Sequence, residues 1–212
     1  MSFFDLAQLN FKYPNQKTDG IQDFSMSIDE GEIVALLGNS GSGKSTILRL
    51  IAGLETPKSG SLRINQKVMF DNTLNLAPQE RGIGMIFQDY SLFPHLTVLQ
   101  NVMFGVPRKR KKERENSAMK VLAMVQLMDH ARKYPQECSG GQQQRIAIAR
   151  ALAAEPNILL LDEPFSNLDE ELKKSVRTEI KDLLTKYNIT AILVTHDKED
   201  VAAVADRVIH IA

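Results

Sequence analysis

The order of apolar and polar residues along the chain predicts a first group of half-buried strands. Between residues 3 and 28, apolar side chains alternate with polar ones, which is typical of strands that are buried on one face only. The segments 60–65 and 67–70 lie on either side of a polar turn and predict a further hairpin. These segments together predict antiparallel strands in the N-terminal third of the chain.

Four continuous apolar runs predict a second group of strands, buried on both faces. They span residues 33–37, 83–87, 158–161 and 191–195. Between the last two runs, the segment Glu171–Tyr187 has a helical apolar face made of Leu172, Val176, Ile180, Leu183 and Leu184. Buried strands separated by helices favour an α/β fold with a mostly parallel sheet. In such sheets ligands bind beyond the carboxyl ends of the strands, so the residues that end these runs are candidate site residues.

The segment after the first run matches the phosphate-binding pattern G-x-x-x-x-G-K-[ST]. It consists of Gly38, Asn39, Ser40, Gly41, Ser42, Gly43, Lys44 and Ser45, and a helical pattern begins at Thr46. Strand, glycine-rich loop and helix form the context in which backbone N–H groups and a helix N-terminus surround phosphate oxygens. The pattern predicts a bound nucleoside triphosphate, with Lys44 at the outer phosphates and the Ser45 hydroxyl on Mg²⁺.

The other three runs end at polar residues suited to the same chemistry. Asp162 ends one run and is the expected Mg²⁺ partner, while the adjacent Glu163 would orient or deprotonate an attacking water. Gln88 follows a second run, and His196 follows the third. A lone histidine at a strand end is more often structural, but its polar neighbours favour a role near the outermost phosphate.

Ser139, Gly140, Gly141 and Gln142 open a further helical segment and predict a second anion-binding site. Ser139 is a good N-cap, and the two glycines expose backbone N–H groups. One nucleotide has little need of two such sites in a single chain. The sequence therefore predicts a two-fold dimer in which each chain lends its second site to the nucleotide of the other.

Composition limits the remaining alternatives. The chain has 212 residues with 26 Lys and Arg and 26 Asp and Glu, so no charge excess argues for binding to nucleic acid or to an anionic membrane surface. It contains no apolar stretch of the roughly 18 residues needed to span a bilayer. A single cysteine, Cys138, excludes an internal disulfide. We expect one domain that reaches a membrane only by docking.

With these residues in hand, nearly the whole chain resembles the ATP-binding subunits of ABC transporters. The family's motifs occur in order as Walker A (Gly38–Ser45), Q-loop (Gln88), signature (Ser139–Gln142), Walker B (Leu159–Asp162, then Glu163), D-loop (Ser166–Asp169) and switch histidine (His196). The resemblance implies ATP and Mg²⁺ as cofactors. It also implies that Tyr13 stacks on the base, that Gln88 contacts the metal, and that Asp169 and the signature contact nucleotide.

The resemblance further implies an organisation and a set of partners. We expect a single P-loop NTPase domain over residues 1–212: a catalytic core with an antiparallel β part (1–88 and 139–212), an inserted helical lobe (about 89–138), and no C-terminal regulatory domain. An ATP-driven head-to-tail dimer would hydrolyse ATP on the cytoplasmic face of the inner membrane and act on separate permease subunits, indirectly with a substrate-binding protein. The stretch 81–98 is similar to that of bacterial importers for ferric iron, polyamines, sulfate or molybdate, and sugars.

Two residues depart from the family pattern, and one alternative function stays open. Cys138 stands where the signature usually has leucine, and Asn167 where the D-loop usually has alanine. Neither change removes a phosphate-binding group. The alternative is a soluble ABC-type ATPase of DNA repair or translation. Against it, the chain has no long coiled coil between its two halves and no duplicated cassette.

Overall fold

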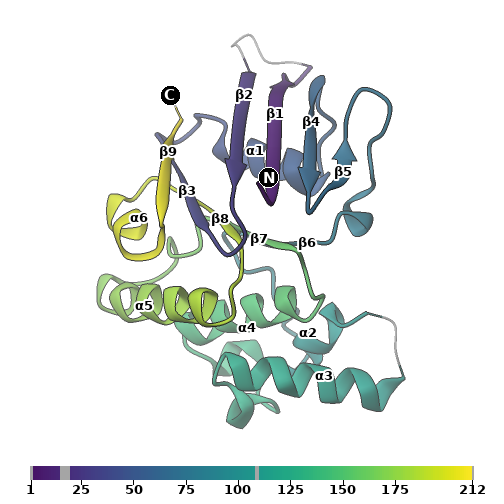
Figure 1. Cartoon of the computed structure of the whole chain (residues 1–212). Helices are drawn as coiled ribbons and strands as arrows, with labels where there is room; N and C mark the ends of the chain where they lie inside the picture. The colour runs from purple at the N-terminus through teal and green to yellow at the C-terminus, as the bar shows by residue number, and fades with distance from the viewer. Residues whose placement is uncertain (1, 15–19, 108–109, 212) are drawn as a thin grey trace.

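The computed structural model describes residues 2–14, 20–107 and 110–211, and these form two β-sheets flanked by helices (Figure 1). The first sheet is antiparallel with strand order β2-β1-β4-β5. Its strands are β1 (Phe4–Phe11), β2 (Ile21–Ile28), β4 (Ser59–Ile64) and β5 (Lys67–Phe70). The antiparallel strands predicted from apolar alternation and from the hairpin pattern are confirmed.

The second sheet is parallel, with strand order β6-β7-β8-β3-β9. Its strands are β3 (Ile33–Leu37), β6 (Ile83–Ile86), β7 (Ile158–Asp162), β8 (Ala191–Thr195) and β9 (Arg207–His210). Four of them correspond to the predicted apolar runs. The pattern did not predict β9, because this edge strand pairs with β3 alone in the described sheet and keeps mostly exposed side chains.

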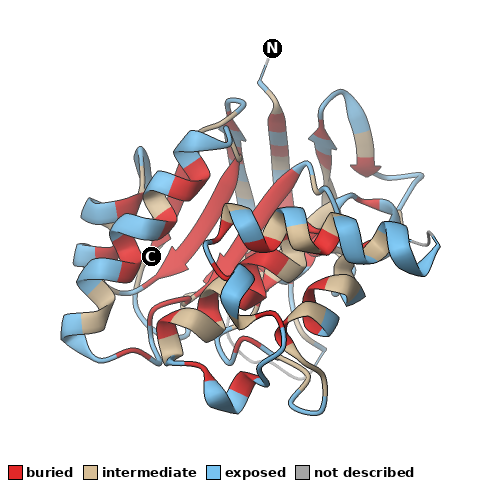
Figure 2. Ribbon diagram, turned by 90° about the horizontal axis from the view of Figure 1, so that it is seen from below, coloured by how far each residue is buried: buried red, intermediate tan, exposed pale blue. Residues whose placement is uncertain are grey.

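Helices cover the parallel sheet on both faces. Their bounds are α1 (Lys44–Ala52), α2 (Val98–Gly105), α3 (Lys111–Met124), α4 (Gly140–Leu152), α5 (Glu170–Lys186) and α6 (Lys198–Val204), with short 3₁₀ turns at Pro78–Glu80, Met128–His130 and Pro135–Glu137. Because successive side chains of a strand point to opposite faces, β3 sends Ile33 and Ala35 into a core shared with α4 and α5. Val34 and Leu36 enter the other core, with α1 and the antiparallel sheet. Figure 2 shows the buried residues gathered in the parallel strands and on the inner sides of the helices.

The expected helical lobe contains α2 and α3, which pack against α4 (Figure 1). Helix α3 buries Ala118 and Leu122. Helix α2 begins at Thr97, whose hydroxyl accepts from the Gln100 N–H at 3.3 Å, while the Gln100 side chain accepts from the Thr97 N–H at 2.9 Å. This reciprocal cap marks the start of α2, a helix so short that the spacing of its apolar residues does not identify it as a helix.

Candidate nucleotide-binding site

A cavity of about 840 Å³ lies between the predicted phosphate loop and the antiparallel sheet. Residues 40–47 form one wall, and Phe11, Tyr13 and Phe24 contribute to the other. Gln88 and Glu163 also line the cavity. Residues that follow three of the four predicted runs therefore line one cavity, whereas His196, which follows the fourth run, is not among the described lining residues. The volume is in the range of small-molecule and cofactor pockets.

The loop 38–45 has the conformation that its glycines allow. Gly41 and Gly43 have φ angles of +83° and +89°, in the left-handed region that favours glycine. Gly38 is required for a different reason: a Cβ atom there would lie 2.3 Å from the carbonyl oxygen of Ile211, just beyond β9. Helix α1 begins at Lys44, within this segment, and its first residues line the cavity, so its N-terminus faces the cavity.

Lys44 is buried within the loop that precedes it. Its ammonium group donates to the carbonyl oxygens of Gly38 at 2.8 Å and Asn39 at 2.7 Å, and the residue is 4% exposed. These bonds hold the positive charge at the base of the cavity. The ammonium therefore lies beside the loop N–H groups that would face phosphate oxygens.

Ser45 and Asp162 meet across 117 positions of sequence. The Ser45 hydroxyl donates to Asp162 Oδ1 at 2.7 Å. Burial raises the pKa of Asp162, and the neighbouring charge of Glu163 adds to this effect, although the hydrogen bond from Ser45 opposes it. A hydroxyl and a partly buried carboxylate are oxygen ligands of the kind that Mg²⁺ prefers, and a bound cation would favour the ionised carboxylate. The two side chains therefore fit a metal that bridges to phosphate.

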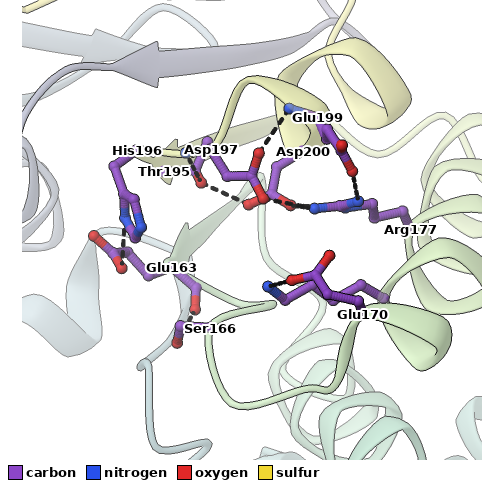
Figure 3. A network of polar contacts seen from close by, with 10 residues as sticks. Glu163, Ser166, Glu170, Arg177, Thr195, His196, Asp197, Glu199 and Asp200 are labelled. Carbon is purple, nitrogen blue, oxygen red and sulfur yellow. Dashed lines mark hydrogen bonds and ion pairs between the residues drawn. The ribbon is translucent and has the colours of Figure 1, made fainter.

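Glu163 and His196 come from the ends of β7 and β8 and point toward each other (Figure 3). Their Oε2 and Nδ1 atoms are 3.2 Å apart. The Glu163 backbone N–H donates to the Val194 carbonyl at 2.9 Å and its φ angle is +46°, which is uncommon for a residue with a side chain. Such a conformation is found more often at functional sites than elsewhere.

Two predicted residues have contacts that their motifs did not indicate. The Gln88 carbonyl accepts from the Asn167 side-chain amide at 2.7 Å, so Asn167 links the predicted Q-loop and D-loop. Asp169 caps α5 by accepting from the Leu172 N–H at 2.9 Å. The sequence signal for the Asp169 contact is its position: an Asp directly before a helical pattern is a common helix N-cap.

Tyr13 lines the cavity on the side of the antiparallel sheet. Its ring packs edge-on against Phe11 with 4.7 Å between ring centroids, and its hydroxyl donates to Glu55 Oε1 at 3.4 Å. These contacts hold the tyrosine beside the loop that carries Lys44. Its predicted stacking on a base is compatible with this position.

The four residues of the predicted second anion site, Ser139–Gln142, cap and open helix α4. Ser139 Oγ accepts from the Gln142 N–H at 3.3 Å, and Gln142 Oε1 accepts from the Ser139 N–H at 3.0 Å. This capping box leaves the N–H groups of Gly140 and Gly141 without an intrahelical acceptor. None of these four residues is among the described residues that line the cavity. The two predicted anion sites of one chain are therefore separate.

Comparison with known proteins decides the family. The family model described as ABC transporter matches residues 21–166, which is more than half of the chain. The chain belongs to the ABC transporter family. It is 49% identical over 191 residues to a protein of Rhizobium meliloti, "Fe(3+) ions import ATP-binding protein FbpC 1", covering 89% of this chain and 53% of that protein. It is 45% identical over 206 residues to the "Sulfate/thiosulfate import ATP-binding protein CysA" of Escherichia coli, covering 94% and 55%.

Solved structures of ABC cassettes have the same fold. CbiO1 from Clostridium perfringens, part of the ABC transporter complex cbiONQ, superposes with a TM-score of 0.87 at 29% identity, covering 99% of this chain and 84% of that one. The dimeric structure of MJ0796, a bacterial ABC transporter cassette, has a TM-score of 0.79 at 33% identity and coverage of 98% and 94%. The predicted P-loop NTPase fold is thereby confirmed. The chain spans about half the length of the curated relatives it matches.

Proposed function

We propose that this chain binds and hydrolyses ATP and is the ATP-binding part of an ABC importer. The observation that carries the proposal is the convergence of the Lys44 loop, the Ser45–Asp162 pair and the Glu163–His196 pair at one end of the parallel sheet. These are the groups needed to hold a triphosphate, neutralise its charge and activate a water. The relatives named as import ATP-binding proteins support the same activity.

Each residue has a role that its position allows. The N–H groups of the loop and of the first turn of α1 would hold the phosphate oxygens, and Lys44 would exchange its carbonyl contacts for the outer phosphates. Ser45 and Asp162 would hold Mg²⁺, which when bound neutralises charge on those phosphates. Glu163 would accept the proton of the attacking water, and His196 would orient Glu163 or contact the outermost phosphate.

The second anion site supports a head-to-tail dimer as the active species. Ser139–Gln142 stand apart from the cavity of their own chain, so they are free to close the cavity of a second copy. An isologous two-fold arrangement would complete two equal sites, each with Asp169 nearby from the partner. A solved neighbour is described as a dimeric cassette, which supports this arrangement.

Docking to membrane subunits is the remaining part of the proposal. Within the described residues, no helix has the length and apolar character needed to cross a bilayer. The helical lobe carries an exposed aromatic group: Phe104 is 62% exposed and packs on Phe93, with ring centroids 4.6 Å apart. A short helix of a permease could bind there. Because Gln88 precedes this lobe and lines the cavity, it would link the phosphate to the docked helix. The chain would lie on the cytoplasmic face of the inner membrane, and it would work with a substrate-binding protein only indirectly.

The hydrolytic step is tested by Glu163→Gln. We expect turnover of Mg²⁺-ATP to fall roughly 100- to 10,000-fold, because a general base contributes about that factor. Binding of ATP should be retained, and size-exclusion chromatography at saturating Mg²⁺-ATP should show a dimer. A variant that stays monomeric with ATP bound would contradict the composite site, and one that hydrolyses like the wild type would contradict the role of Glu163.

The transport role is tested by what accompanies the protein from its native membranes. Extraction in a mild detergent followed by mass spectrometry should recover a multi-span membrane protein with the wild-type chain. Phe104→Asp should lose that partner while its ATP hydrolysis in solution stays at the wild-type level. Recovery of the wild type with a soluble nucleic-acid or ribosomal partner instead would favour the alternative, a soluble ABC-type ATPase.

A further inference from the structure

Arg177 of α5 is buried against three carboxylates at the start of α6 (Figure 3). Its side chain is only 3% exposed. The guanidinium donates to Asp200 at 2.7 Å, to Glu199 at 2.9 Å and to Asp197 at 2.7 Å. Burial by itself lowers the pKa of Arg177, but the hydrogen bonds and charges of Asp200, Glu199 and Asp197 together outweigh it and raise the pKa overall. Arg177 is therefore a permanent buried cation.

Asp200 connects this cation to the turn that carries His196. Its second oxygen, Oδ2, accepts from the Thr195 hydroxyl at 2.6 Å, and Thr195 is 2% exposed. The same hydroxyl oxygen accepts from the Asp197 N–H at 3.0 Å. Of the two neighbours of His196, Asp197 is thus bonded directly to Arg177, and Thr195 is connected to Arg177 through the Asp200 carboxylate (Figure 3). His196 itself is the exposed residue between two restrained neighbours.

Arg177 also lies beside the segment that follows Glu163. Its Cζ atom is 6.0 Å from the centroid of the Phe165 ring. Phe165 is 1% exposed and follows Glu163 by two residues. One buried side chain therefore packs behind both turns that carry Glu163 and His196, whose Oε2 and Nδ1 atoms are 3.2 Å apart.

We propose that Arg177 is a positioning residue for the hydrolytic pair, acting through Asp200 and Thr195 to hold His196 against Glu163. The proposal rests on the ATP hydrolysis proposed above. A planar guanidinium with five fixed donors can bind three carboxylates in one geometry, which an ammonium point charge cannot do. Replacing a buried ion cluster by apolar side chains is often neutral for stability, so stability alone does not account for this arrangement.

The most direct test concerns the hydroxyl of Thr195. Valine keeps the shape of the threonine side chain but removes the hydroxyl, whereas serine keeps the hydroxyl. In steady-state hydrolysis of Mg²⁺-ATP, Thr195→Val and Arg177→Met should each lower kcat roughly 10- to 100-fold, since a small misplacement of a catalytic group costs about that factor. The KM for ATP should change by no more than about twofold, because no contact to nucleotide is altered. Thr195→Ser should recover most of the lost kcat.

Lys181→Met is the matched control. Lys181 lies one turn further along α5 and pairs with Asp206, away from the His196 turn. It should leave kcat unchanged. The proposal would be overturned if Thr195→Val and Arg177→Met fold and keep the wild-type kcat. It would also be overturned if Thr195→Ser is as slow as Thr195→Val. Thermal unfolding identifies variants that fail to fold, and if Arg177→Met is one of them the two Thr195 variants decide.

A second measurement does not depend on turnover. The chain has four histidines, so selective labelling gives few imidazole signals, and the His196 signal is the one that disappears in His196→Gln. In Thr195→Val this NMR signal should move toward its position in Glu163→Gln, where the charged partner is lost. An unmoved signal would overturn the positioning role. A wild-type chain without ATP hydrolysis would instead overturn the proposed function, and the imidazole signal would still decide the role of Arg177.

Discussion

Lys44 illustrates how one residue is held ready for a ligand. The residue is 4% exposed, and its ammonium donates to the carbonyl oxygens of Gly38 and Asn39, which belong to the phosphate loop itself. Burying a charge is costly unless hydrogen bonds compensate it. The loop provides this compensation while keeping the positive charge at the base of the cavity, so a triphosphate would need little rearrangement to reach it.

Lys44→Ala should weaken binding of ATP roughly 10- to 100-fold, because hydrogen bonds to charged groups are worth about 1.5–3 kcal/mol. Equilibrium titration with a fluorescent ATP analogue measures this directly. The control is Lys67→Ala, which removes a lysine from the exposed start of β5. Equal affinities for Lys44→Ala and the control would remove Lys44 from the phosphate site.

At the scale of elements, the helix that follows the phosphate loop is held at its far end by Arg81. This arginine is 1% exposed, and its Nη1 donates to the carbonyls of Leu50 at 2.8 Å and Ile51 at 2.7 Å, in the last turn of α1. Its other nitrogens donate to Leu76 and to Asn75. A cation at the C-terminus of α1 complements the helix dipole whose positive end faces the cavity. Arg81 thus fixes the orientation of α1 beneath the phosphate loop.

Arg81→Leu should lower the free energy of unfolding by about 2–5 kcal/mol, since it leaves several buried acceptors unpaired at about 1–3 kcal/mol each. Urea denaturation monitored by circular dichroism gives this value. Arg63→Leu, on an exposed position of β4, should change it by less than about 0.5 kcal/mol, as surface substitutions usually do. If Arg81→Leu lowers the free energy of unfolding no more than Arg63→Leu does, the buried contacts of Arg81 do not stabilise α1.

At the scale of the whole molecule, the two predicted anion sites of one chain do not face the same cavity. The loop before α1 lines the cavity, while the capping box that opens α4 packs its glycines close to Leu168 and Val176. A Cβ atom added at Gly140 or at Gly141 would lie less than 3 Å from one of these side chains. The close packing sets the start of α4 beside the D-loop and α5, at the surface where a second copy is proposed to bind.

Ser139→Arg in the Glu163→Gln background should abolish the ATP-dependent dimer. Nucleotide affinity of the monomer should stay within about twofold, because Ser139 does not line its own cavity and an uninvolved group adds no binding energy. Size-exclusion chromatography with and without Mg²⁺-ATP, alongside a nucleotide titration, separates the two effects. Ser175→Arg, at an exposed serine of α5, is the control and should still dimerise. A dimer in both double variants would contradict the shared site, as would a loss of affinity confined to Ser139→Arg.

The sequence by itself determined the elements and motifs whose signals are local. Apolar runs and alternation depend on neighbours one to four residues away, and they predicted four strands of the parallel sheet, the antiparallel strands and the face of α5. The phosphate loop was equally predictable, because its glycines, lysine and serine are consecutive. The cap at Ser139 was found for the same reason.

The motifs already predicted that Ser45 and Asp162, 117 positions apart, share a metal site. Only the tertiary structure decided the contacts of Arg81, Asn167 and Arg177, because nothing near them in the sequence indicates the helix end, loop carbonyl or carboxylates that each one binds. Their partners follow from the strand order β6-β7-β8-β3-β9, which is set by packing of the whole chain. Local sequence patterns do not indicate that strand order. A buried polar contact depends on where two elements lie relative to each other, and not on the residue spacing within either element.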